Sequence, residues 1–83
     1  MEKGESRMSP EARNCIIFLI ALTGESQTKI AEQFGMTKGE IHAIINNKLK
    51  FYGIVYTIKE FIDYDAWWKS VIRKELDVLW HLL

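Results

Sequence analysis

This chain of 83 residues has little of several features that commonly define a function. Its single cysteine, Cys15, excludes an intrachain disulfide, and one unpaired thiol is typical of a reducing cytoplasm. Eleven Lys and Arg balance eleven Asp and Glu, so no overall field of one sign attracts nucleic acid. The unbroken apolar run Cys15–Leu22 is far too short to cross a bilayer. We therefore expect a cytoplasmic protein that does not enter the membrane.

The sequence also lacks the patterns that catalysis and cofactor binding usually need. Its two His residues, His42 and His81, are too few and too far apart for a metal site, and no Cys/His cluster has metal-ligand spacing. There is no glycine-rich phosphate loop and no Ser/His/Asp arrangement. Asp63 and Asp65 are better explained as helix caps than as an acid/base pair. We therefore expect no enzymatic activity, no cofactor and no metal.

What the chain has in quantity is apolar material: 48% of its residues are hydrophobic, and they include three Trp, four Phe and three Tyr. A chain of this length forms one small domain with a modest core, so we expect residues 1–83 to be a single domain in which residues 1–8 are flexible. The surplus predicts either a core dense in aromatic residues or a surface that a partner covers. A second copy of the chain is the commonest such partner.

The segment Gln27–Asn46 has the periodicity of two short helices joined by a tight turn. The apolar faces of these helices consist of Ile30, Ala31 and Phe34 in the first and Ile41, Ile44 and Ile45 in the second. Gly35 lies between them, where the chain must reverse and where glycine takes a left-handed conformation without steric cost. Ser26 is a suitable N-cap for the first helix, and Thr37 and Glu40 have the spacing of a capping box for the second.

This segment resembles the helix-turn-helix superfamily of DNA-binding proteins. Ala31, Gly35 and Ile41 stand where that superfamily has a small residue, the turn glycine and a β-branched core residue. The resemblance covers about a quarter of the chain and departs from the pattern at Gly39, which costs roughly 1 kcal/mol of helix propensity relative to Ala. It implies a helix-turn-helix over residues 26–47 whose second helix enters the DNA major groove. Small proteins of this size and style are frequent in phages and mobile elements.

The outer face of the second motif helix, residues 38–46, carries side chains that suit base edges and phosphates. Asn bonds adenine through two hydrogen bonds, Lys donates to guanine, and Ala contacts the thymine methyl. Gly39 removes bulk where the helix approaches the groove. Residues 27–50 hold four Lys against two Glu and are the only net positive third of the chain. The predicted DNA-binding residues are Gln27, Thr28, Thr37, Lys38, Gly39, His42, Ala43, Asn46, Asn47, Lys48 and Lys50.

A helix is predicted before the motif, over residues 9–23. Ser9 and Pro10 are a suitable N-cap and first residue, and Gly24 ends the helix. Its main apolar stripe is expected to comprise Ala12, Cys15, Ile16 and Leu19. Because much of the remaining circumference is apolar as well, we expect this helix to cover the motif and also to pack on the C-terminal segment.

The C-terminal segment, residues 50–83, is expected to serve packing and dimerisation. β-Branched and aromatic residues favour an extended stretch over residues 50–56. A capping-box pattern at Thr57 then starts a short helix that breaks near Asp63. Asp63 or Asp65 can cap a last helix over residues 66–82. The predicted fold is therefore all-α, a small helical domain with a central helix-turn-helix, a C-terminal helix and one short extended segment.

The apolar sector of the last helix is wider than one groove requires, which leaves two interpretations. The helix is either a core helix of a small bundle, or it packs inside with one edge and forms a dimer interface with the other. The candidate dimer-interface residues are Trp68, Leu76 and Trp80.

Two functions remain in competition. The first, which we prefer, is a sequence-specific DNA-binding protein, a small dimeric transcriptional regulator that reads double-stranded DNA with residues 38–46. The alternative is a protein-binding module or inhibitor that uses the helix-turn-helix as a scaffold and its aromatic C-terminus to bind a larger protein. The intact motif and its local positive charge favour the first function. Zero net charge and the surplus of apolar residues favour the second.

Overall fold

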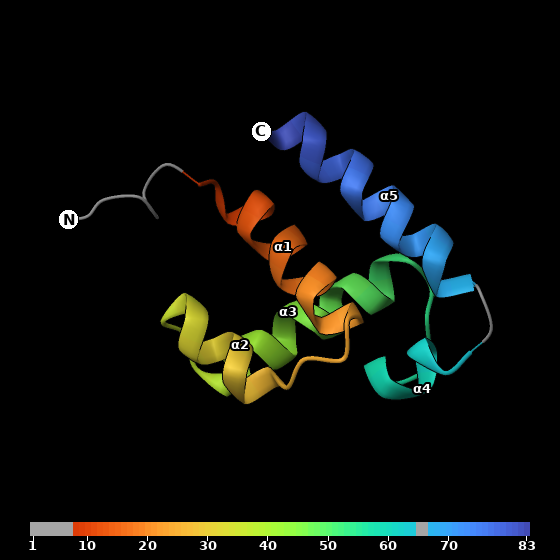
Figure 1. Ribbon diagram of the computed structural model, residues 1–83, viewed down its shortest axis with the longest axis horizontal. Helices are drawn as coiled ribbons and strands as arrows, with labels where there is room; N and C mark the ends of the chain where they lie inside the picture. The colour runs from red at the N-terminus through yellow and green to blue at the C-terminus, as the bar shows by residue number, and fades with distance from the viewer. Residues whose placement is uncertain (1–7, 65–66) are drawn as a thin grey trace.

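The computed structural model describes residues 8–64 and 67–83, and these residues form α-helices and no strand (Figure 1). The helices are α1 (Pro10–Leu22), α2 (Gln27–Phe34), α3 (Lys38–Phe51), α4 (Ile58–Ile62) and α5 (Trp67–Leu82). The predicted all-α class is confirmed. α1 contacts each of the other four helices, with α5 running beside it (Figure 1). The first helix is therefore buried on more than one side, as its apolar circumference predicts.

Local interactions close the ends of the helices that the sequence predicts. The Ser26 hydroxyl accepts a hydrogen bond from the third residue of α2 at 3.2 Å. Gly35 ends α2 in the left-handed conformation, with φ 62°. The Thr37 hydroxyl accepts from the Glu40 N–H at 3.1 Å, and the Glu40 carboxylate accepts from the Thr37 N–H at 2.8 Å, which is the expected capping box. α2 and α3 are thus two helices joined by a tight turn.

The extended segment predicted over residues 50–56 is wrong. α3 continues to Phe51, and Gly53 then adopts a left-handed conformation with φ 72°. The N–H groups of Gly53 and Ile54 donate to two carbonyls of the last turn at 3.0 and 2.8 Å, which is a Schellman ending. Leu49 and Ile54, which this ending brings together, both belong to the core. Packing of these apolar residues in the tertiary core outweighs their preference for a strand.

α4 begins with the predicted capping box at Thr57 and ends at Ile62. Asp63 follows as the C-cap of α4, so it does not start α5, as one of the two sequence alternatives had it. Asp65 and Ala66, for which the sequence predicts a cap and a helix start, lie outside the described residues. So do residues 1–7, for which it predicts flexibility.

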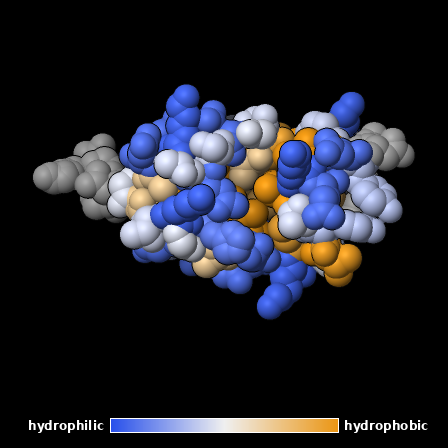
Figure 2. Space-filling view, turned by 90° about the horizontal axis from the view of Figure 1, so that it is seen from below, coloured by the Kyte–Doolittle hydropathy of each residue, from blue (hydrophilic) through white to orange (hydrophobic). Residues whose placement is uncertain are grey.

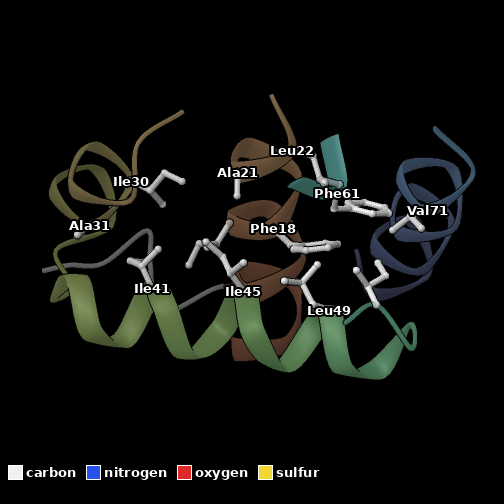
Figure 3. Packing of buried hydrophobic residues seen from close by; sticks show 12 residues of the cluster. Phe18, Ala21, Leu22, Ile30, Ala31, Ile41, Ile45, Leu49, Phe61 and Val71 are labelled. Atoms are coloured by element: carbon white, nitrogen blue, oxygen red, sulfur yellow. The ribbon is translucent and has the colours of Figure 1, made fainter. Parts of the chain in front are cut away.

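The core is assembled around the inner face of α3. Figure 3 shows Ile41, Ile45 and Leu49 pointing from α3 toward side chains of the other helices. The α1 side chains that are buried are Ala12, Cys15, Ile17, Phe18, Ala21 and Leu22. Of the predicted main stripe, Ala12 and Cys15 are buried, whereas Ile16 and Leu19 are only partly buried.

Not all of the apolar surplus is buried. Phe51, Val55, Trp80 and Leu83 are each more than three-quarters exposed. Figure 2 shows one face of the molecule on which hydrophilic side chains predominate toward α2 and hydrophobic side chains gather nearer α4. The surface therefore has separate polar and apolar regions, and each needs its own explanation.

Candidate nucleic-acid interface

The side of α3 that faces away from the core is open to solvent. Its inner residues Ile41 and Ile45 are at most 1% exposed, whereas His42 and Ala43 between them are exposed. An outer stripe recurs at every third or fourth residue, which is the spacing of one helix face. This outer stripe of α3 consists of Gly39, His42, Ala43, Asn46 and Lys50. The structure thus brings five of the predicted contact residues together on one surface.

Two side chains of the outer stripe are already oriented by each other. The amide nitrogen Nδ2 of Asn46 lies 2.9 Å from Nε2 of His42, one helical turn away. With the His42 proton on Nδ1, Nε2 accepts one amide proton of Asn46. The carbonyl Oδ1 and the second amide proton of Asn46 remain free, and these are the two groups that an Asn uses to bond adenine. The pair is therefore compatible with base contact.

No contact among the described residues requires a glycine at position 39. A Cβ placed there would meet only the Thr37 hydroxyl, at 3.9 Å, which is an ordinary contact. Its φ lies outside the left-handed region, in contrast to that of Gly35. The helix therefore carries the propensity cost of a glycine without any benefit to its own packing.

At the start of α3, the structure bears on Thr37, one of the predicted DNA-binding residues. The Thr37 N–H donates to the Glu40 carboxylate, so it is not available to a phosphate. Hydrogen bonds from the backbone and side chain of Thr37 hold the pKa of Glu40 below its usual value, and the carboxylate stays charged at this end of the helix. Lys38, next along the chain, is exposed.

Lys48 does not belong to this interface, although the sequence places it there. Its ammonium nitrogen points inward and lies 3.1 and 3.2 Å from the two carboxylate oxygens of Glu75. The Lys48 side chain is only 20% exposed, and Nζ also lies 3.4 Å from the sulfur of Cys15. A buried carboxylate attracts the lysine more strongly than solvent does, so the ammonium is withdrawn from the surface.

Glu75 is the important residue that the sequence analysis missed. It is 0% exposed, and Oε1 accepts a hydrogen bond from the Tyr52 hydroxyl at 2.6 Å. Oε2 has no hydrogen-bond donor among the described residues and relies on the ion pair with Lys48. The one clue in the sequence is its spacing, because Glu75 follows the buried Val71 by one helical turn.

Glu75 also affects the pKa values of Cys15 and Tyr52, which belong to the same buried cluster. Burial and the neighbouring carboxylate raise the pKa of the Cys15 thiol and that of the Tyr52 phenol. Both groups therefore stay neutral near pH 7. The cluster joins α1, α3 and α5, and its role is structural, because it holds α5 against the helices that position the outer stripe.

The remaining predicted DNA-binding residues lie on α2 and α3. Thr28 is exposed and Gln27 half-buried in the first turn of α2, and Asn47 is exposed on α3 beside the outer stripe. Lys50 and Asn46 border a groove of about 540 Å3 whose other wall is the segment 53–57. The candidate dimer residues separate: Trp68 packs on the core, whereas Leu76 and Trp80 are exposed.

No protein family, no curated protein and no solved structure matches this chain. The geometry of the residues is therefore the basis on which the candidate interface is assessed. Within residues 8–64 and 67–83, no group of three or more His, Cys, Asp or Glu could hold a metal ion. No helix in this part of the chain is long and apolar enough to span a membrane.

Proposed function

We propose that this protein is a sequence-specific DNA-binding protein, a small transcriptional regulator that reads the major groove of double-stranded DNA with the outer stripe of α3. The observation that carries the proposal is the open outer face of a helix whose opposite face is locked into the core by Ile41, Ile45 and Leu49. With 14 residues, α3 is about 21 Å long, and a major groove about 12 Å wide admits such a helix.

Each residue of the outer stripe has a role in this arrangement. Gly39 and Ala43 carry little or no side chain, so the helix can approach the base edges closely. His42 and Asn46 supply the polar groups that distinguish one base pair from another. Lys50, near the end of the helix, and Lys38, at its start, supply the positive charge that phosphates attract. The contacts therefore divide into base readout at the centre and backbone positioning at the two ends.

A selection from a random library of duplexes at low salt tests the proposal. The wild-type protein should enrich one preferred sequence. Asn46→Ala should weaken binding to that sequence by about 1–3 kcal/mol while leaving nonspecific binding unchanged. Lys50→Ala should weaken binding to all sequences and reduce the salt dependence by about one phosphate contact. Lys59→Ala, an exposed lysine on α4, is the matched control and should change neither. Failure to enrich any sequence would refute the proposal.

The Gly39→Ala variant tests the effect of this glycine on stability separately from its effect on DNA affinity. The added methyl group meets only ordinary contacts, so the free protein should become more stable by up to about 1 kcal/mol. The same methyl group would stand between the helix and the groove, so specific affinity should fall. Thermal melting and DNA titration of one variant measure both effects. A variant that is more stable and binds as tightly as the wild type would remove the argument from Gly39.

A protein-binding module is the second candidate function, and one observation favours it. Leu76 and Trp80 on α5 are 51% and 77% exposed, and Leu83, directly after it, is 79% exposed. Exposed apolar residues that gather in one region are typical of a surface that contacts another protein. In this alternative the α2–α3 pair is a scaffold and α5 contacts a larger protein. A chain that selects no DNA sequence and does not self-associate would favour this second function.

A further inference from the structure

The structure places a charged residue of α1 close to the start of α3. Arg13 lies near the beginning of α1, and the sequence analysis does not assign it to the interface. The low pKa of Glu40 is due mainly to hydrogen bonds with Thr37, and the nearby positive charge of Arg13 adds to it. We propose that Arg13 binds a phosphate of the DNA strand that lies on the α1 side of α3. This inference rests on the proposed function and extends the interface to a second helix.

One side of α3, next to the outer stripe, faces the start of α1. The residues that line a hollow of about 220 Å3 between the two helices, called the α1–α3 hollow, are Asn14, Ile44, Asn47, Lys48 and Phe51. Asn47 follows Ala43 of the outer stripe by four residues, so this side borders the stripe directly. Figure 3 shows α1 behind α3, with its first turns near the level of α3 and its later turns, which carry Ala21 and Leu22, above. The start of α1 therefore lies alongside α3, at the edge of its open face.

Two hydrogen bonds hold the guanidinium of Arg13 at this edge. Its Nε and Nη2 donate to Oδ1 of Asn14 at 3.3 and 3.1 Å, and both residues are half-buried. A guanidinium has five N–H groups, so two on Nη1 and one on Nη2 are not used by Asn14. Paired N–H groups of this kind match two oxygens of a phosphate. Because the side chain is already oriented, Arg13 loses less conformational entropy on binding than a freely moving lysine does.

The position of α3 in the groove brings a phosphate strand to this edge. In the proposed arrangement α3 lies in the major groove, which a sugar-phosphate strand borders on each side. The strand on the α1 side meets Arg13, and the side-chain amide of Asn47 can donate to the same strand. Glu40 precedes Ile44 by one turn on this side of α3, and its negative charge repels a phosphate. Arg13 therefore attracts the strand and also offsets the carboxylate of Glu40.

Binding to duplex DNA as a function of salt concentration tests the contact. Arg13→Gln removes one positive charge, so the slope of log K against log salt concentration should become shallower by about 0.9, the value of one phosphate contact. Between about 50 and 200 mM salt, the variant should therefore lose about 3.5-fold less affinity than the wild type. Arg73→Gln is the matched control, because it removes the same charge from an exposed arginine on α5, and it should leave the slope unchanged. Thermal melting shows whether each variant folds, and Arg13→Met replaces Arg13→Gln if the glutamine variant does not.

Ethylation interference on the selected duplex locates the contact. In the wild type, ethylation of the phosphate that Arg13 binds should weaken the complex, because it removes the negative charge of that phosphate. In Arg13→Gln the same ethylation should have no effect, since the contact is already lost. Asn47→Ala should become insensitive at a neighbouring phosphate of the same strand, because both residues lie on the α1 side of α3. Loss of the two contacts on opposite strands would overturn the placement.

The outcomes separate this contact from the proposed function. If the wild type selects one sequence but Arg13→Gln keeps the wild-type salt dependence, the Arg13 contact is overturned and the proposed function stands. If the wild type binds duplexes without preference and Arg13→Gln still makes the slope shallower, the contact is supported and the sequence-specific function is refuted. A wild-type chain that binds no duplex at low salt would overturn both.

Discussion

Replacing Lys48 by Met isolates the energetics of the buried ion pair between α3 and α5. The variant keeps the aliphatic stem of Lys48 and removes its ammonium group, which in the wild type lies 3.1 and 3.2 Å from the two oxygens of Glu75. Glu75 is 0% exposed, so its carboxylate cannot turn to water. The Tyr52 hydroxyl, 2.6 Å from Oε1, would still donate to it. Lys48→Met therefore leaves a buried negative charge without its cation.

The expected loss is large for a protein of this size. Removing one partner of a buried ion pair costs about 3–5 kcal/mol, and a small domain has a free energy of unfolding of only about 5–15 kcal/mol. A loss of 3 kcal/mol corresponds to a melting temperature lower by about 12–24 °C. Glu75→Gln should cost less, about 1–2 kcal/mol, because the Lys48 side chain is 20% exposed and its ammonium can reach water.

Urea and thermal unfolding of Lys48→Met, Glu75→Gln and the double variant measure these losses. The double variant should be more stable than Lys48→Met alone, since a neutral amide beside a thioether leaves no buried charge. Two results would refute the reasoning. One is a Lys48→Met variant within about 0.5 kcal/mol of the wild type, which is the range of ordinary surface substitutions. The other is a double variant whose loss is the simple sum of the two single losses.

Two further predictions concern the α2–α3 turn and the buried thiol and phenol. Gly35→Val should lower the free energy of unfolding by about 1–2 kcal/mol because φ at this residue is 62°, and Gly35→Asn should lose less; equal thermal melting of the two variants would contradict this. Cys15 and Tyr52 have pKa values above their ordinary 9.0 and 10.0, so above pH 9 the folded chain binds more protons than the unfolded one. Stability should therefore be complete below pH 8 or so and fall as the pH rises through the ordinary pKa values. In melts between about pH 8 and 11, the double variant Cys15→Ala, Tyr52→Phe should show a smaller decline than the wild type.

The sequence by itself determines where several helices of this protein begin and end. Ser26, Thr37 and Thr57 each accept a hydrogen bond from a backbone N–H three residues later, and Gly35 turns left-handed between two helices. These interactions involve near neighbours only, so the residue types and their spacing are enough to predict them. The exposure of the outer stripe of α3 follows in the same way, because the inward isoleucines define the opposite face of the helix.

Only the tertiary structure decides how residues 50–56 fold and where Lys48 points. The apolar residues of 50–56 favour a strand in isolation, but the packing of Leu49 and Ile54 in the core closes a helix there instead. Lys48 and Glu75 are 27 residues apart, and neither side chain reveals in the sequence that the other lies beside it. The same is true of Trp68, which packs on the core while Trp80, on the same helix, does not.

The physical reason for this division is the range of the interactions. A helix cap or a left-handed turn is stabilised by hydrogen bonds and backbone preferences within about five residues. The residues that form it are therefore all visible in one short stretch of the sequence. Burial, and the ion pairs that burial strengthens, depend on which distant helices meet, and α1 brings α3 and α5 together around the carboxylate of Glu75. A charged residue in a mostly apolar helix can therefore be assigned to the core or to the surface only when its neighbours in space are known.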